Sequence, residues 1–257
     1  MPLPKKKSEI EKNHLKKKYL WYGRPKSGKT TVASYFGGDD DNKTIFFCTE
    51  PGHSFVEIYK WENGQGKQPT QWMDFVECCR ELYTQDHDFS LLAIDTVDIL
   101  WGWCTKYICD LNEISHPSEM GFGKAYQAIA AEFSKVCNHL GQKGIGFIFI
   151  SHEKEYEIQN GPRKESAITT TLPSGAAKFI HGFVDYIWHF NSTVDGKRYV
   201  QTARADNINA GSRGNVMHDP LPIRMPMNPQ LIIEQLNKVV ERKEPLFFFD
   251  EEEEIDI

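Results

Sequence analysis

Short apolar runs alternate along the chain with longer stretches in which apolar residues recur at helical spacing. Helical spacing marks residues 71–85, 97–112 and 123–141, and residues 31–36 form a shorter helix-compatible stretch. The apolar runs, which predict strands, lie at residues 19–23, 44–49, 90–95, 145–150, 184–190 and 198–202. Strands that are apolar throughout and separated by helices indicate a mostly parallel sheet buried on both faces, hence an α/β fold. Asp195-Gly196 between the last two runs predicts a C-terminal hairpin.

The two ends of the chain differ from this pattern in charge and composition. Residues 1–17 form a basic arm, with seven lysines between residues 5 and 18, and residues 244–257 form an acidic tail that we expect to be disordered. Prolines precede a short predicted helix in residues 215–243, which suggests a linker and leaves residues 18–214 as one domain. Opposite charges at the ends suggest an electrostatic partner such as nucleic acid, although solvated charge runs explain them nearly as well.

The composition bears on membrane association, on location and on the role of the cysteines. No apolar run reaches the roughly 18 residues of a membrane helix, and the N-terminus lacks the apolar core of a signal peptide, so we expect no membrane association and a cytoplasmic location. If the chain is phage-encoded, that location is the host cytoplasm. The six cysteines include no CxxC pair, which indicates small buried apolar residues rather than a metal site.

Residues 23–30, Gly-Arg-Pro-Lys-Ser-Gly-Lys-Thr, lie between the first predicted strand and a helix-compatible stretch. Two glycines allow the backbone to wrap around a polyphosphate with its amides pointing inward, next to the positive end of a helix. Lys29 would reach the β- and γ-phosphates, and the Thr30 hydroxyl would bind Mg²⁺. The sequence therefore predicts an ATP and Mg²⁺ site that comprises Gly23, Arg24, Pro25, Lys26, Ser27, Gly28, Lys29, Thr30 and Thr31.

Three more polar residues follow predicted strands, whose carboxyl ends meet at one edge of a parallel sheet. Asp95 ends the apolar run 91–95 and is placed to hold Mg²⁺ through water. Glu50 follows the second strand, where a carboxylate can polarise the attacking water, although an ordinary turn acid fits there too. His152 follows the fourth strand and could contact the γ-phosphate, or be an edge histidine without a role. Asp98 is interpreted as a helix-start residue.

Taken together, the phosphate loop, Glu50, the run ending in Asp95 and the segment Ser151-His152-Glu153-Lys154 resemble the RecA-like core. More closely, residues 18–214 resemble compact phage-encoded AAA-type ATPases related to RecA and RadA, the Sak-type single-strand-annealing recombinases. The stretches that begin at Gly123 and Ser174 resemble the corresponding segments of the same family.

This resemblance implies that ATP binds between adjacent subunits of a ring or filament, with Glu50 as the catalytic glutamate and His152 as a sensor. The sensor would couple the γ-phosphate to a mobile DNA-binding loop at residues 153–173. Within or near that loop the candidate contacts to single-stranded DNA are Lys154, Tyr156, Arg163 and Lys164, with Phe122 as a second, separate candidate. A basic residue would act across the interface on the neighbour's ATP, and the candidates are Lys197, Arg198, Arg204 and Arg213.

The function predicted from these features is a DNA-stimulated ATPase that acts on single-stranded DNA in recombination or annealing. We expect a homo-oligomer, with a single-strand-binding protein or another replication protein as a further partner. A hexameric helicase or translocase on the same core is the main alternative. A small-molecule kinase, or an annealing protein in which ATP is only a structural switch, is also compatible with the motifs.

Overall fold

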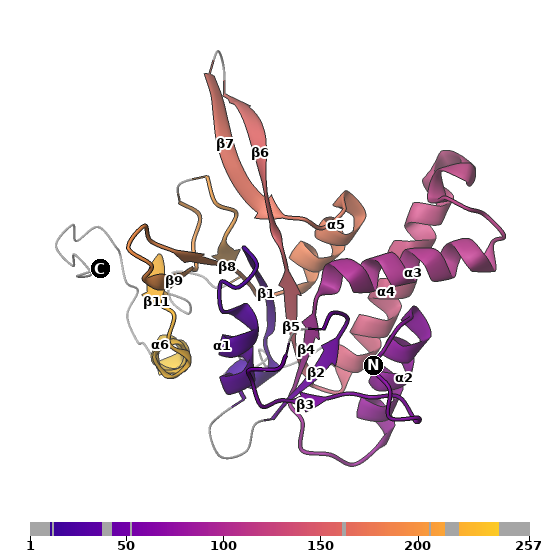
Figure 1. Ribbon diagram of the computed structural model, residues 1–257, viewed down its shortest axis with the longest axis horizontal. Coiled ribbons are helices and arrows are strands. Elements are labelled where there is room, and N and C mark those ends of the chain that lie inside the picture. The colour runs from indigo at the N-terminus through magenta and orange to yellow at the C-terminus, as the bar shows by residue number, and fades with distance from the viewer. Residues whose placement is uncertain are drawn as a thin grey trace, which may run out of the picture.

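The computed structural model describes residues 11, 13–37, 43–51, 53–160, 163–205, 207–213 and 221–241, with the backbone alone at 158–160, 163–165 and 238–241. The acidic tail, residues 215–220 of the predicted linker and most of the basic arm therefore lie outside the described residues. A central sheet organises the rest of the chain, with helices on both of its faces (Figure 1).

The sheet has nine strands, in the order β11-β9-β8-β1-β5-β4-β2-β3, with β10 also paired to β8. Its strands are β1 (Lys18–Gly23), β2 (Thr44–Cys48), β3 (Tyr59–Lys60), β4 (Leu91–Asp95), β5 (Gly146–Ser151), β8 (Tyr186–Ser192), β9 (Arg198–Gln201), β10 (Gly211–Ser212) and β11 (Arg224–Pro226). Strands β8, β1, β5, β4, β2 and β3 run parallel, whereas β9, β10 and β11 are antiparallel to their neighbours. The predicted α/β fold with a mostly parallel sheet and a C-terminal hairpin, β8–β9, is confirmed.

Two helical layers cover the sheet because side chains along each buried strand point alternately to opposite faces. On β1, Leu20 packs with one layer, and Tyr19 and Trp21 pack with the other. The first layer comprises α2 (Trp72–Thr84), α3 (Val97–Leu111), α4 (Lys124–Gln142) and α5 (Ser174–Phe183); the second comprises α1 (Lys29–Tyr35) and α6 (Pro229–Glu241) (Figure 1). The chain also forms three short 3-10 helices, η1 (His14–Lys16), η2 (Pro117–Glu119) and η3 (Gly121–Gly123), within the described residues. In the described part of the chain, no helix combines the length and the apolar character needed to cross a bilayer.

Large aromatic side chains fill both cores. Trp21 and Trp188 stack with ring centroids 5.8 Å apart on the α1 side, and Trp72 stacks on Phe133 at 5.4 Å on the other. Such pairs add about 0.5–1.5 kcal/mol to the free energy gained by burying their area. All six cysteines are buried, and burial raises the pKa of the Cys48 thiol to about 12.

The segment predicted as a DNA-binding loop, residues 153–173, is a β-hairpin over most of its length. Strands β6 (Glu153–Asn160) and β7 (Arg163–Thr170) pair in an antiparallel register from Glu153 opposite Thr170 to Asn160 opposite Arg163. In Figure 1 the hairpin projects beyond the sheet from the end of β5. The prediction of a loop is therefore wrong. Strand β6 carries charged residues at positions 153, 154, 155 and 157, so the apolar run that marks a buried strand is missing there.

The predicted linker is also wrong where the structure describes it. Residues 224–226 form β11, which pairs with β9, and the short helix predicted after them is confirmed as α6. Ile232 and Leu236 of α6 are buried in the same core as Val32 of α1. The domain therefore continues beyond residue 214 and includes this C-terminal strand and helix.

Candidate active site

The predicted phosphate loop connects the end of β1 to α1, and its two glycines are required by its geometry. Gly23 has φ 155°, and a Cβ placed on it would lie 2.2 Å from the Phe190 carbonyl oxygen on the neighbouring strand β8. Gly28 has φ 101°, a backbone conformation that other residues rarely adopt. Both positions therefore accept only glycine, as a loop that wraps closely around a ligand requires.

Lys29 is almost fully buried beneath this loop. Its Nζ donates hydrogen bonds to the carbonyl oxygens of Gly23 and Arg24, each at 2.9 Å. Burial, only partly opposed by carboxylates of which Asp95 contributes most, lowers the pKa of Lys29 to about 8. A buried ammonium bonded to neutral carbonyls is poorly compensated, and a polyphosphate in the loop would supply the missing negative charge. The loop therefore fits a nucleotide phosphate chain.

Thr30 and Asp95, predicted as the Mg²⁺ ligands, lie in direct contact. The Thr30 hydroxyl donates to Asp95 Oδ2 at 2.7 Å, which brings the first turn of α1 to the end of β4. Hydroxyl and carboxylate oxygens are the ligands that Mg²⁺ takes in proteins, so this pair fits the ion. His53 Nε2 lies 3.2 Å from the same Asp95 oxygen and is buried. Sequence reasoning missed His53, although its position three residues after Glu50 was a usable signal.

Glu50 lies beside this pair at the end of β2, and the backbone around it is tied to β4. The Thr49 hydroxyl accepts from the Thr96 amide at 2.7 Å and donates to the Thr96 carbonyl at 2.9 Å. The Thr49 amide also donates to the Asp95 carbonyl at 2.8 Å. These bonds hold Glu50 and Asp95 at neighbouring strand ends, and the Thr96 hydroxyl reaches Glu50 Oε1 at 3.3 Å. Glu50 thus lies at the same edge of the sheet as Thr30 and Asp95, where sequence reasoning expected it.

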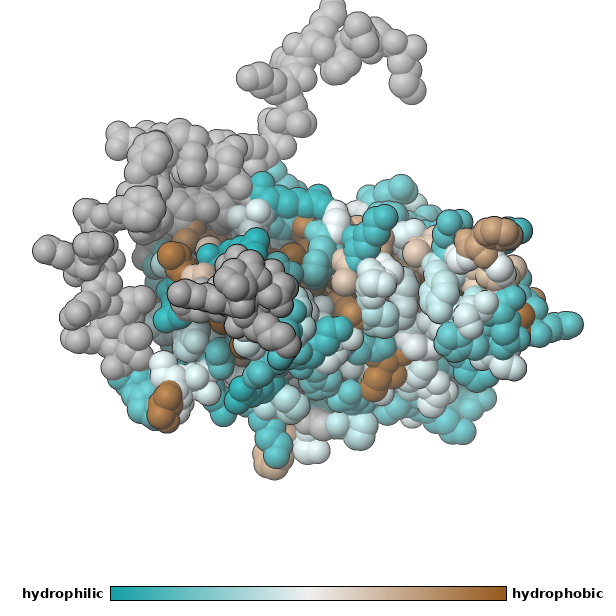
Figure 2. Space-filling view, turned by 90° about the horizontal axis from the view of Figure 1, so that it is seen from above, coloured by the Kyte–Doolittle hydropathy of each residue, from teal (hydrophilic) through white to brown (hydrophobic). Residues whose placement is uncertain are grey.

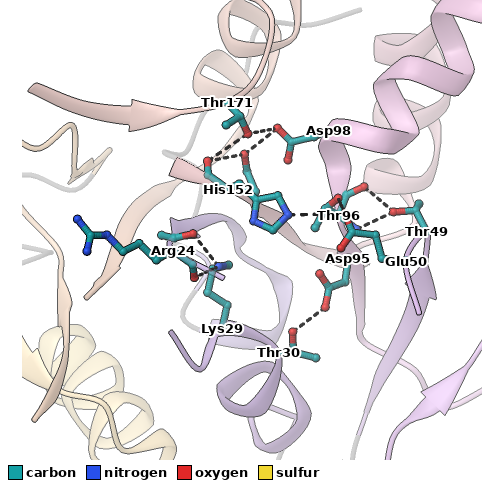
Figure 3. A network of polar contacts seen from close by, with 12 residues as sticks. Arg24, Lys29, Thr30, Thr49, Glu50, Asp95, Thr96, Asp98, His152 and Thr171 are labelled. Atoms are coloured by element: carbon teal, nitrogen blue, oxygen red, sulfur yellow. Dashed lines mark hydrogen bonds and ion pairs between the residues drawn. The ribbon is translucent and has the colours of Figure 1, made fainter. Parts of the chain in front are cut away.

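His152 connects Glu50 to the base of the β6–β7 hairpin (Figure 3). Its Nε2 lies 3.6 Å from Glu50 Oε1, and its carbonyl accepts from the Thr171 amide at 2.9 Å. Asp98, interpreted from sequence only as a helix-start residue, lies in the first turn of α3 and accepts hydrogen bonds from Ser151 at 3.1 Å and Thr171 at 2.5 Å. The residues that flank the hairpin on both sides are therefore bonded to the site.

A second connection joins the phosphate loop to the hairpin. The Glu153 carboxylate accepts from Arg24 Nε at 2.9 Å and from His189 Nε2 at 2.6 Å. Burial of Glu153 opposes its ionisation, but the hydrogen bonds from His189 and Arg24 outweigh it and hold the pKa of this carboxyl below its ordinary value. Sequence reasoning did not assign a role to Glu153 or His189, because they meet only through the pairing of distant strands.

The predicted DNA-contact residues lie on two separate parts of the chain. Lys154 and Tyr156 are exposed on β6, while the side chains of Arg163 and Lys164 on β7 lie outside what the structure describes. Phe122 is 99% exposed in the connection between α3 and α4, which lies on the side of the molecule away from α1 in Figure 1. The structure does not bring Phe122 together with the hairpin residues.

The four candidates for a basic residue acting across an interface have different surroundings. Arg198 lines a pocket together with the phosphate loop of its own chain. Lys197 Nζ lies 3.7 Å from Asp195 in the β8–β9 turn. Arg204 and Arg213 are exposed and are not among the residues that line this pocket.

Comparisons with known proteins identify the family. No curated protein matches the chain significantly. Among solved structures, that of the RadB recombinase matches over 72% of this chain and 80% of its own, with 14% sequence identity and a TM-score of 0.43. The sequence profile of a family described as "AAA domain" matches residues 15–214, which include the phosphate loop, Glu50, Asp95 and His152. The chain therefore belongs to this AAA-domain family.

Proposed function

We propose that this protein is an ATPase that acts on single-stranded DNA in phage-type homologous recombination or single-strand annealing. One observation carries the proposal: the predicted nucleotide-binding and catalytic residues meet at one edge of the sheet, and the β6–β7 hairpin starts from the same edge. His152 lies beside Glu50 and is bonded through its carbonyl to Thr171, so the two ends of the hairpin segment are anchored at the site. Occupation of the site by a nucleotide would thus act on the hairpin.

Each residue of the site then has a defined task. Lys29 and the loop amides bind the phosphates, and Thr30 and Asp95 hold Mg²⁺, which when bound offsets charge on the phosphate oxygens. Glu50 accepts the proton of the attacking water, since a carboxylate at this edge can act as a general base. His152 contacts Glu50 and serves as the sensor.

The two faces of the hairpin suit different partners, one the phosphate loop and the other single-stranded DNA. Successive side chains along a strand point to opposite faces, so Glu153 and Glu155 share one face of β6, and Lys154 and Tyr156 share the other. The acidic face is engaged by Arg24, whose Nη2 lies 3.8 Å from Glu155. The opposite face presents a cation and an aromatic ring, the pair of groups that binds single strands through phosphate contacts and base stacking.

The surface seen in Figure 2 agrees with a polar ligand. Where described residues are visible from above, it is mostly hydrophilic, and apolar residues occur only in small separate patches. We further propose, from the resemblance of the motifs to RecA-like recombinases, that the protein forms a homo-oligomer and cooperates with a single-strand-binding protein.

The test is ATP hydrolysis measured with and without a single-stranded oligonucleotide, in wild-type protein and in the Glu50→Gln and Lys29→Ala variants. We expect stimulation by the oligonucleotide, and loss of turnover in both variants. Glu50→Gln should still bind ATP, whereas Lys29→Ala should not, because Lys29 binds phosphate and Glu50 acts on water. Glu57→Gln, an exposed acid on the same segment, is the matched control and should behave as wild type. Turnover indifferent to nucleic acid would contradict the proposal and favour a kinase.

A further inference from the structure

We infer that Arg198 binds the phosphate chain of the nucleotide held by its own subunit, and does not reach across an interface to a neighbour's nucleotide. The inference rests on the proposed ATP site and adds a binding residue to it. It concerns a pocket of about 320 Å³ between the phosphate loop and the β8–β9 hairpin. The lining residues are Arg24, Pro25, Lys26, Ser27, Phe190, Asn191, Ser192, Gly196 and Arg198.

The pairing of the strands determines the direction of the Arg198 side chain. Arg198 pairs with Ser192 of β8, and Val200 pairs with Phe190. Side chains two residues apart on a strand share a face, so Arg198 points to the same face of the sheet as Val200. Val200 is buried in the core that contains Val32 of α1. Arg198 therefore lies on the α1 face, two residues nearer the strand end at which the phosphate loop lies.

Distances to the loop agree with this placement. A Cβ at Gly28 would lie 3.5 Å from Arg198 Nη1 and 2.7 Å from Met227 Sδ. The Met227 amide donates to the Arg198 carbonyl at 3.1 Å, and β11 pairs with β9 over the preceding residues. The backbone of Arg198 is thus held on both sides by the sheet, so its closeness to Gly28 follows from the fold and not from a mobile loop.

The charges around the pocket indicate an anionic ligand. Arg198, Arg24 and Lys26 all line it, and among the residues that the structure describes only Arg24 of these three forms an ion pair with a carboxylate, that of Glu153. A guanidinium stays charged and donates in a planar fork that matches phosphate oxygens. Because the same pocket is lined by Ser27 of the phosphate loop, the anion it fits is the phosphate chain held by that loop.

The first test measures binding, with a fluorescent ATP analogue titrated into wild-type protein, Arg198→Ala and Arg198→Lys. We expect Arg198→Ala to weaken binding about 10- to 100-fold, as the loss of a charge-assisted hydrogen bond does. Arg198→Lys should recover part of it, because the charge remains. Arg80→Ala, which removes an exposed arginine on α2, is the matched control and should bind as wild type. Thermal unfolding of each variant separates lost binding from lost folding.

The second test distinguishes action within a subunit from action across an interface. Lys29→Ala and Arg198→Ala proteins are mixed, and ATP hydrolysis of the mixture is compared with that of each variant alone. If Arg198 served the neighbouring site, mixed assemblies would pair an intact loop with an intact arginine and regain activity. We expect no recovery. Recovery of activity in the mixture, or unchanged ATP affinity in Arg198→Ala, would overturn this inference but leave the ATPase proposal intact. A wild-type protein that does not bind ATP would instead overturn the ATPase proposal itself.

Discussion

Replacing Glu153 by glutamine tests the connection between the phosphate loop and the hairpin. The change keeps the size of the side chain but removes the charge that accepts hydrogen bonds from His189 at 2.6 Å and Arg24 at 2.9 Å. His189 is fully buried and the Glu153 side chain is 8% exposed, so this bond is shielded from water. A charge-assisted hydrogen bond of this kind contributes roughly 1.5–3 kcal/mol.

The Arg24 pair adds less. The Arg24 side chain is 69% exposed, and exposed ion pairs contribute at most about 1 kcal/mol because water screens them. A glutamine can still accept one hydrogen bond, which returns part of the loss. We therefore expect Glu153→Gln to lower the free energy of unfolding by about 2 kcal/mol at pH 7. Urea denaturation of the two proteins measures this difference.

The pH dependence of that difference provides a second check. The pKa of Glu153 is lower in the folded protein than its ordinary value of 4.5, so the folded state binds fewer protons than the unfolded state in this range. The stability that Glu153 contributes is therefore fully present above pH 4.5 and is lost as the pH falls through the folded pKa. Wild-type and Glu153→Gln proteins should approach equal stability in acid.

Glu155→Gln is the control, because Glu155 lies on the same strand and its Oε1 lies 3.8 Å from Nη2 of the same arginine, Arg24. The Glu155 side chain, however, is 63% exposed. We expect it to change the free energy of unfolding by less than about 0.5 kcal/mol. Equal losses in the two variants, or a Glu153→Gln loss that does not change with pH, would refute the reasoning.

Three further predictions follow from the packing and from the hairpin. Gly146→Ala should destabilise the protein by several kcal/mol, because the new Cβ would lie 2.3 Å from the Leu15 carbonyl and 2.6 Å from that of Lys17; thermal unfolding near the wild-type temperature would contradict this. Phe133→Ala, which empties a fully buried position between α2 and α3, should cost about 3–5 kcal/mol in urea denaturation, and a loss below about 1 kcal/mol would argue against the packing. Tyr156→Ala should weaken binding of a labelled oligonucleotide by about 1–3 kcal/mol without changing ATP affinity, and unchanged DNA binding would remove Tyr156 from the proposed contact face.

The sequence alone predicted the central strands, most of the flanking helices and the phosphate loop. Each of these features has a local signal: a strand buried on both faces is apolar throughout, and a loop around phosphate needs glycines, lysine and threonine at set spacing. Asp95 and Glu50 were found because residues that follow parallel strands must share one edge of the sheet. Thr30 and Asp95, each predicted from sequence to bind Mg²⁺, form a direct hydrogen bond in the folded chain.

Features that depend on pairing between distant segments emerged only from the folded chain. The sequence did not predict the hairpin because β6 is rich in charged residues and lacks an apolar run, and its pairing with β7 is set only in the folded chain. His53, Glu153 and His189 gained their contacts through strands separated by many residues in sequence. The side of the sheet to which Arg198 points follows from its register against β8, and a shift of one residue would reverse it. Local patterns specify what each segment can form, whereas register and packing specify which side chains meet.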